Sequence, residues 1–155
     1  MNAEVLNFKP IFKSVRLEAG SAPRAFPLVQ LYDPHQSVPG WTQFVRSQSR
    51  TAHRGVNAIA DQRGYLHALF VWNVDRHLTW RRVLRVSSVV LAALPGCAVQ
   101  HAVIRAMRDL AGERECEAIL IEPGNEHSGL GRNLLQSTGF LPLSESAFVQ
   151  RLDQR

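Results

Sequence analysis

Apolar and polar positions divide the chain into a punctuated N-terminal part and a more regular remainder. Residues 1–20 carry alternating apolar positions that can supply a first strand. Residues 20–40 contain four prolines, which favours an irregular segment with room for one short helix. After Gly40, apolar side chains three and four positions apart, beginning with Trp41, predict a helix over 41–51.

The centre of the chain predicts a β-hairpin followed by another strand. Residues 56–60 and 65–74 are rich in β-branched and aromatic side chains. They flank Asp61–Gly64, where Asp at the first position and Gly at the last suit a type I turn. Residues 82–94 predict a further, mostly buried strand, which Pro95–Gly96 ends.

The C-terminal third alternates between helical and extended patterns. Residues 98–111 have one apolar stripe and one charged face, which predicts an amphipathic helix. Residues 117–122 predict a short buried strand, and residues 128–138 a second helix. Residues 140–152 return either as one extended segment or as a hairpin around Pro142. The expected helix caps are Gly112, Ser128 and Gly139.

This order predicts one α/β domain over residues 1–155, a mixed sheet with helices on its faces. Apolar residues make up 45% of the chain and charged residues 20%, so a disordered or fibrous chain is excluded. The longest apolar run, Val86–Leu94, is too short for a membrane span of roughly 20 residues. The start of the chain shows no signal-peptide pattern.

The cysteines and the charge point to a compartment and to a class of partner. Cys97 and Cys116 form neither a CxxC motif nor a zinc-site spacing, so we expect a reduced, cytoplasmic protein without a metal. The net charge is +5, and 16 of the 18 basic residues are Arg. This excess reflects either a GC-rich genome or an anionic partner. No basic block of 5–8 residues occurs, which does not favour nucleic acid.

The segment Leu134–Phe140, LLQSTGF, is similar to the helix end L-Y-x-x-x-G-F of the GCN5-related N-acetyltransferase (GNAT) family. The order of predicted elements over residues 54–152 also resembles that family, whereas residues 1–53 match it only in length and coarse character. The resemblance implies a mixed, mainly antiparallel central sheet with helices on both faces. It also implies acetyl-CoA as co-substrate and an amine as acceptor.

The family pattern Q/R-x-x-G-x-G/A aligns with Ala93–Ala98, so Ala replaces the first Q/R. A shift by one residue fits worse. The resemblance assigns the coenzyme A pyrophosphate to the backbone at the start of the helix, at Gly96, Cys97, Ala98 and Val99. No side chain there can cap the helix, and its first turn has no carboxylate. Either an anion or water can therefore satisfy the free N–H groups.

The resemblance assigns further roles along the same site. A splayed central strand offers backbone N–H groups to the thioester near Val89, Val90 and Leu91. Ser128 stands where the family commonly has Asn and adds to the cofactor-binding set. Leu135 stands where the family has the Tyr that protonates the leaving thiolate, so that acid is absent.

Two side chains are candidates for proton transfer. Glu122 ends the strand after the main helix, and His127 follows in the loop. Ligands gather at the carboxyl ends of strands in open α/β sheets, and His can take a proton near neutral pH. The alternative for each is a solvated loop side chain.

Three functions compete. The first is an N-acyltransferase that uses acetyl-CoA or another acyl-CoA. The second is a non-catalytic acyl-CoA-binding or protein-interaction module, which the replaced motif positions favour. The third is a basic nucleic-acid-binding domain, which lacks a supporting signature. The sequence does not identify the acceptor amine. We also expect that the C-terminal strand can extend the sheet into a homodimer.

Overall fold

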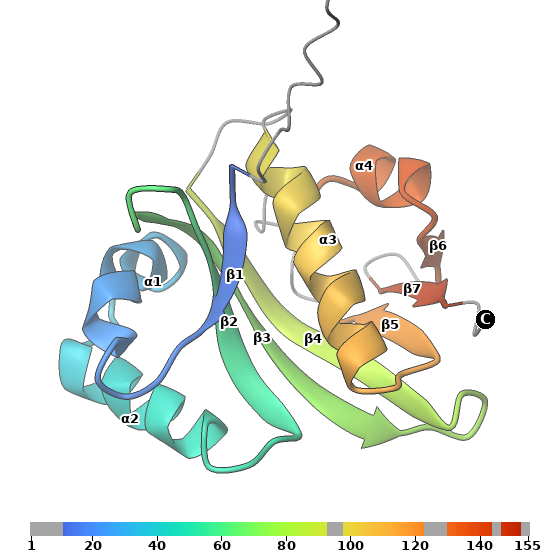
Figure 1. The fold of residues 1–155 in the computed structure, drawn as a ribbon, viewed down its shortest axis with the longest axis horizontal. Coiled ribbons are helices and arrows are strands. Elements are labelled where there is room, and N and C mark those ends of the chain that lie inside the picture. Colours follow the sequence, from blue (N-terminus) through green and yellow to red (C-terminus); the bar gives the residue numbers. More distant parts are fainter. Residues whose placement is uncertain (1–10, 93–97, 123–129, 144–146, 153–155) are drawn as a thin grey trace, which may run out of the picture.

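The computed structural model describes residues 11–92, 98–122, 130–143 and 147–152. Within these ranges a seven-stranded sheet forms the centre, in the order β1-β2-β3-β4-β5-β7-β6. Helices cover both faces of the sheet (Figure 1). The elements are β1 (Lys13–Arg16), the 3-10 helix η1 (Ala22–Ala25), α1 (Phe26–Tyr32), α2 (Val38–Gln48), β2 (Arg54–Ala60), β3 (Leu66–Arg76), β4 (Arg82–Leu91), α3 (Ala98–Glu113), β5 (Ala118–Ile121), α4 (Arg132–Ser137), β6 (Leu141–Pro142) and β7 (Phe148–Arg151).

The sheet is mixed and mainly antiparallel, which confirms the expected fold class. Among the described strands only β4 and β5 pair in parallel. They can do so because α3 lies between them in the chain and returns the backbone to the same end of the sheet.

One face of the sheet carries α3 and α4. The apolar stripe of α3 is buried as predicted, with Val103 and Met107 fully covered. It packs on Phe70 and Trp72 of β3 and on Leu84 of β4, which point to this face. Trp72 is 1% exposed and lies in the core. Figure 1 shows α4 beside the half of α3 that comes first in the chain.

The opposite face carries η1, α1 and α2. The α2 helix begins after Ser37, whose hydroxyl accepts the Gly40 N–H. It buries Trp41 and Val45 against Val56 of β2. The Trp41 indole N–H donates to the Ala22 carbonyl oxygen at 2.7 Å, and this bond fixes α2 against η1. The helix predicted over 41–51 is thus confirmed, but it begins and ends three residues earlier, at Val38 and Gln48.

The β2–β3 hairpin has the predicted turn. Asp61 Oδ1 accepts the backbone N–H groups of Arg63 at 2.8 Å and Tyr65 at 3.0 Å. Asp61 Oδ2 accepts the His67 ring N–H at 2.8 Å. Gly64 has φ +86°, a conformation that favours glycine. The hydrogen bond from His67 and those from the backbone lower the pKa of Asp61.

Of the three predicted helix caps, Gly139 is confirmed, with φ +94° just after α4, and the other two were wrong. The main helix continues through Gly112, and the left-handed residue after it is Glu115. The second helix begins at Arg132 with Gly131 as its N-cap, so Ser128 does not cap it. Ser128 itself lies outside the described residues.

The segment after α4 forms two strands, and Leu143 N–H donates to the Ala147 carbonyl oxygen between them. This selects the hairpin over the single extended segment, although Pro142 lies within β6. The last strand, β7, lies between β5 and β6, so β6 forms this edge of the sheet among the described strands. No helix in the described ranges is long and apolar enough to cross a membrane.

Replacing Trp41 by Phe should destabilise the fold by about 1–3 kcal/mol, because the buried Ala22 carbonyl loses its donor. Thermal unfolding should show a decrease in Tm of several degrees for a domain of this size. The matched control is Val38→Ala on the exposed side of the same helix, expected within about 0.5 kcal/mol of the wild type. Equal Tm values for the two variants would contradict the anchoring role.

Replacing Asp61 by Ala should lower the Tm at pH 7, because the turn loses its side-chain acceptor. A carboxyl with a lowered pKa stabilises the fold above its unfolded-state pKa of about 3.9. That contribution is lost as the pH falls through the lower folded-state pKa. The Tm difference between wild type and variant should therefore be full at neutral pH and shrink at strongly acidic pH. A constant difference would contradict this account.

Candidate functional site

The central strands β4 and β5 separate partway along the sheet. Their parallel pairing covers only Val83–Val86 of β4. The last bond between them runs from the Glu122 N–H to the Val86 carbonyl oxygen, at 3.0 Å. Beyond this point β4 continues to Leu91 against β3, whereas β5 has ended. Among the described strands, none pairs with β4 on its β5 side after Val86, and we call this position the gap.

A β-bulge marks the same position. Val71 of β3 pairs with Ser88, and its neighbour Trp72 pairs with Val86, so Ser87 is the extra residue on β4. A bulge bends its strand and turns the following residues. Val86 and Val89 consequently both face α3, three positions apart in the chain. The bulge therefore directs β4 away at the place where β5 ends.

The side chains of β4 after the bulge lie mostly in the two hydrophobic cores. Val89 is fully buried and Val90 is 6% exposed, while Leu91 is half-buried against the α3 side. Their side chains belong to the two cores, so a role of these residues in ligand binding would fall to main-chain atoms. The role predicted for them, a backbone donor, stays a prediction.

The α3 helix begins at Ala98, as predicted, with Ala98 exposed and the Val99 side chain in the core. Its first turn contains no acidic side chain. The partial positive charge of a helix N-terminus is thus not neutralised there from within the helix. Gly96, Cys97 and His127 lie outside the described residues, as does Ser128.

On the face that carries α1 and α2, an arginine bridges two carboxylates beside the gap. Arg85 Nε donates to Asp75 Oδ2 at 3.1 Å, and Arg85 Nη1 donates to Glu122 Oε1 at 3.2 Å. Register places Arg85 opposite Asn73 of β3 and Leu120 of β5. The three charged side chains thus link β3, β4 and β5 just below the separation.

Of the two predicted proton carriers, the structure describes Glu122 alone. Its backbone lies at the separation of β4 and β5, and its side chain is 30% exposed and paired with Arg85. The sequence analysis missed Asp75 and Arg85. A charged residue inside the apolar segment 82–94 was a signal for Arg85, but its partners depend on a register that the sequence does not reveal.

The described residues do not support a cysteine nucleophile, a metal site or a proton donor at position 135. Cys116 is buried in the core, and this burial raises the pKa of its thiol. The reactive thiolate form is therefore disfavoured at this position. No cluster of His, Cys, Asp and Glu in the described ranges can hold a metal ion. Leu135 is 3% exposed among apolar side chains, so nothing at that position can donate a proton.

Comparisons by sequence find nothing similar. No protein-family model matches the chain, and no curated protein matches it.

Comparison by structure finds N-acetyltransferases. The chain resembles the aminoglycoside N-acetyltransferase AAC(6')-Iy in complex with CoA, with a TM-score of 0.71, 10% identity and 93% of each chain covered. It resembles a spermidine N-acetyltransferase SpeG chimera from Vibrio cholerae and hSSAT, with a TM-score of 0.72 and 12% identity over 91% of this chain and 95% of that one. A GCN5-related N-acetyltransferase from Kribbella flavida matches with a TM-score of 0.69 and 18% identity over 92% and 98%. The chain therefore has the fold of the GCN5-related N-acetyltransferases.

Proposed function

We propose that this protein transfers an acyl group from an acyl-CoA, acetyl-CoA in the first instance, to an amine. The observation that carries the proposal is the separation of β4 from β5 beside the start of α3. Similar solved structures are N-acetyltransferases, and one of them is a complex with CoA. At 10–18% identity they support a shared fold, and the activity is inferred from the site.

The residues around the gap fit the two ends of an acyl-CoA. The first turn of α3, at Ala98 and Val99, would receive the pyrophosphate, since backbone N–H groups at a helix start bind anions and no acidic side chain repels one. We extend this role to Gly96, Cys97 and Ser128 from the sequence. Main-chain atoms of Val89–Leu91 would face the acyl-bearing arm.

The chain itself must handle a proton. Bound acyl-CoA supplies an activated thioester, and the reaction as a whole converts thioester and amine into amide and free thiol. Glu122 is the described carboxylate nearest the end of β5, and we assign it to take the proton that the amine loses, directly or through one water. Arg85 orients the Glu122 carboxylate. With Leu135 buried, the thiol proton comes from solvent or from His127.

A cytoplasmic location belongs to the same proposal. Acyl-CoA transfer needs no disulfide, and Cys116 is a free thiol in the core.

The direct test combines binding and turnover. Acetyl-CoA at about 100 times its Kd should add about 2.7 kcal/mol to the stability and raise the Tm by several degrees. Thiol release should then depend on an added amine, with a panel of primary amines as acceptors. Binding without turnover would favour the non-catalytic module, which the buried Leu135 supports. If acetyl-CoA left the Tm unchanged, the proposed function would be overturned.

Glu122→Gln should lower kcat by about 10²–10⁴-fold, the usual contribution of a positioned base, and leave the acetyl-CoA-induced Tm rise unchanged. Asp75→Asn is the matched control, because Asp75 contacts the same Arg85 from β3, away from the gap. Its kcat should stay within about threefold of the wild type. Equal losses in both variants would assign the carboxylates a shared structural role and contradict the assignment of Glu122.

A further inference from the structure

A cavity of about 360 Å³ lies between β1 and α3, on the face of the sheet that carries α3. Both β2 and β3 separate it from β4, so it does not belong to the gap between β4 and β5. Its volume lies within the range of small-molecule sites. Its lining is about half apolar: Phe12 and Ile59 contribute from the sheet side, and Ala102, Ala106 and Leu110 from α3.

Two polar side chains on the sheet face the cavity with hydrogen atoms to donate. Asn57 is 9% exposed, and its amide oxygen accepts the Trp72 indole N–H at 2.8 Å. Since the indole can only donate, this bond fixes the orientation of the amide. The Asn57 amide N–H then donates to the Ser14 hydroxyl oxygen at 2.9 Å. This leaves the Ser14 hydroxyl hydrogen and the second Asn57 amide hydrogen for another acceptor.

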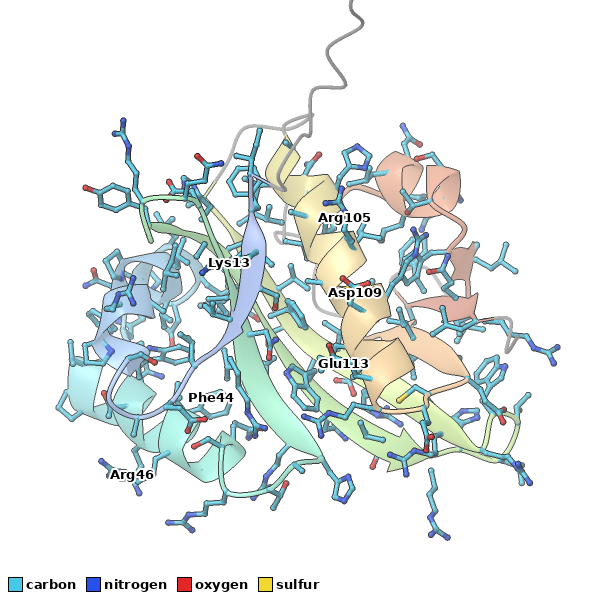
Figure 2. The ribbon with its side chains drawn as sticks, viewed as in Figure 1. Lys13, Phe44, Arg46, Arg105, Asp109 and Glu113 are labelled. Atoms are coloured by element: carbon cyan, nitrogen blue, oxygen red, sulfur yellow. The ribbon has the colours of Figure 1, made fainter. Side chains whose placement is uncertain are left out.

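The α3 wall of the cavity carries charges of both signs in a row. Arg105, Asp109 and Glu113 are spaced four residues apart, about one helical turn each, and Figure 2 shows them in succession along α3. None of the three makes an ion pair within 4 Å or a side-chain hydrogen bond in the part of the chain that the structure describes. Lys13 also borders the cavity, but it pairs with Ala60, whose register places both side chains toward the other face.

A cation and two anions beside apolar lining residues match one class of small molecule. We propose that this cavity binds a free α-amino acid with an apolar side chain. Arg105 receives the α-carboxylate, helped by the Ser14 hydroxyl. Asp109 and Glu113 receive the α-ammonium group. The side chain of the ligand lies between Ile59 of β2 and Leu110 of α3.

This assignment is independent of the proposed acyl transfer. The cavity opens on the α3 face, whereas Glu122 and Arg85 lie on the α1 and α2 face. A bound amino acid therefore acts as an effector or stabilising ligand rather than as the acceptor at the gap.

The experiment is a titration of the wild-type protein with L-leucine, followed by thermal unfolding and by NMR of backbone amides. The titration extends to about 10 mM, which saturates a site with a Kd near 1 mM. L-Leucinamide lacks the carboxylate and N-acetyl-L-leucine lacks the ammonium group, so each should bind at least tenfold more weakly. No binding of leucine, or equal binding of all three probes, would overturn the proposal.

Two pairs of variants locate the site. Arg105→Gln and Asp109→Asn should each weaken leucine binding at least tenfold. Arg46→Gln on α2 (Figure 2) removes the same positive charge outside the cavity and should leave leucine binding unchanged. Glu115→Gln after α3 does the same for the negative charge. Equal weakening by a control and its partner would assign the effect to net charge and reject the site.

Two further measurements separate this site from the proposed reaction. The acetyl-CoA-induced Tm rise should persist in Asp109→Asn, and leucine binding should persist in Glu122→Gln. A loss of leucine binding in Glu122→Gln would place the ligand at the gap instead and reject the cavity. Absence of acetyl-CoA binding would overturn the proposed function while leaving the leucine result intact.

Discussion

The candidate site depends on one constraint, the end of parallel pairing between β4 and β5 after Val86 and Ile121. β4 continues past this point, and its other side is held by β3 along its whole length. β5 is held by β7 on its far side. Neither strand therefore depends on their mutual pairing alone to keep its place in the sheet.

The hydrophobic cores on the two faces of the sheet hold β4 in place beyond its last described pair with β5. After the bulge at Ser87, Val89 packs toward α3 and Val90 packs toward α1. A strand buried on both faces does not need its second hydrogen-bonded neighbour to stay in place, because apolar burial holds it. Arg85 adds a link across β3, β4 and β5, but its pairs are partly exposed and contribute at most about 1 kcal/mol. Its effect is on the position of Glu122.

The parts of the fold that could be predicted from sequence are those with a local cause. The apolar stripe of α3 and the Asp61 turn are each determined by residues close together in the sequence, and both were predicted correctly. The start of α4 was missed because Ser128 is a good cap by type, whereas the helix begins after Gly131. The bulge at Ser87 and the bridge from Arg85 depend on strand register, which a single sequence does not specify.

The two polar side chains on the sheet side of the β1–α3 cavity follow from burying a tryptophan. Trp72 fills the centre of the α3-side core, and its indole N–H needs an acceptor there. Asn57 on the adjacent strand supplies that acceptor, since an apolar side chain at this position would leave the donor unpaired at a cost of about 1–3 kcal/mol. The same amide then turns its N–H groups toward Ser14 and the cavity. A requirement of the core therefore sets hydrogen-bond donors beside the charged row of α3, and the cavity acquires its binding chemistry from the packing of the sheet.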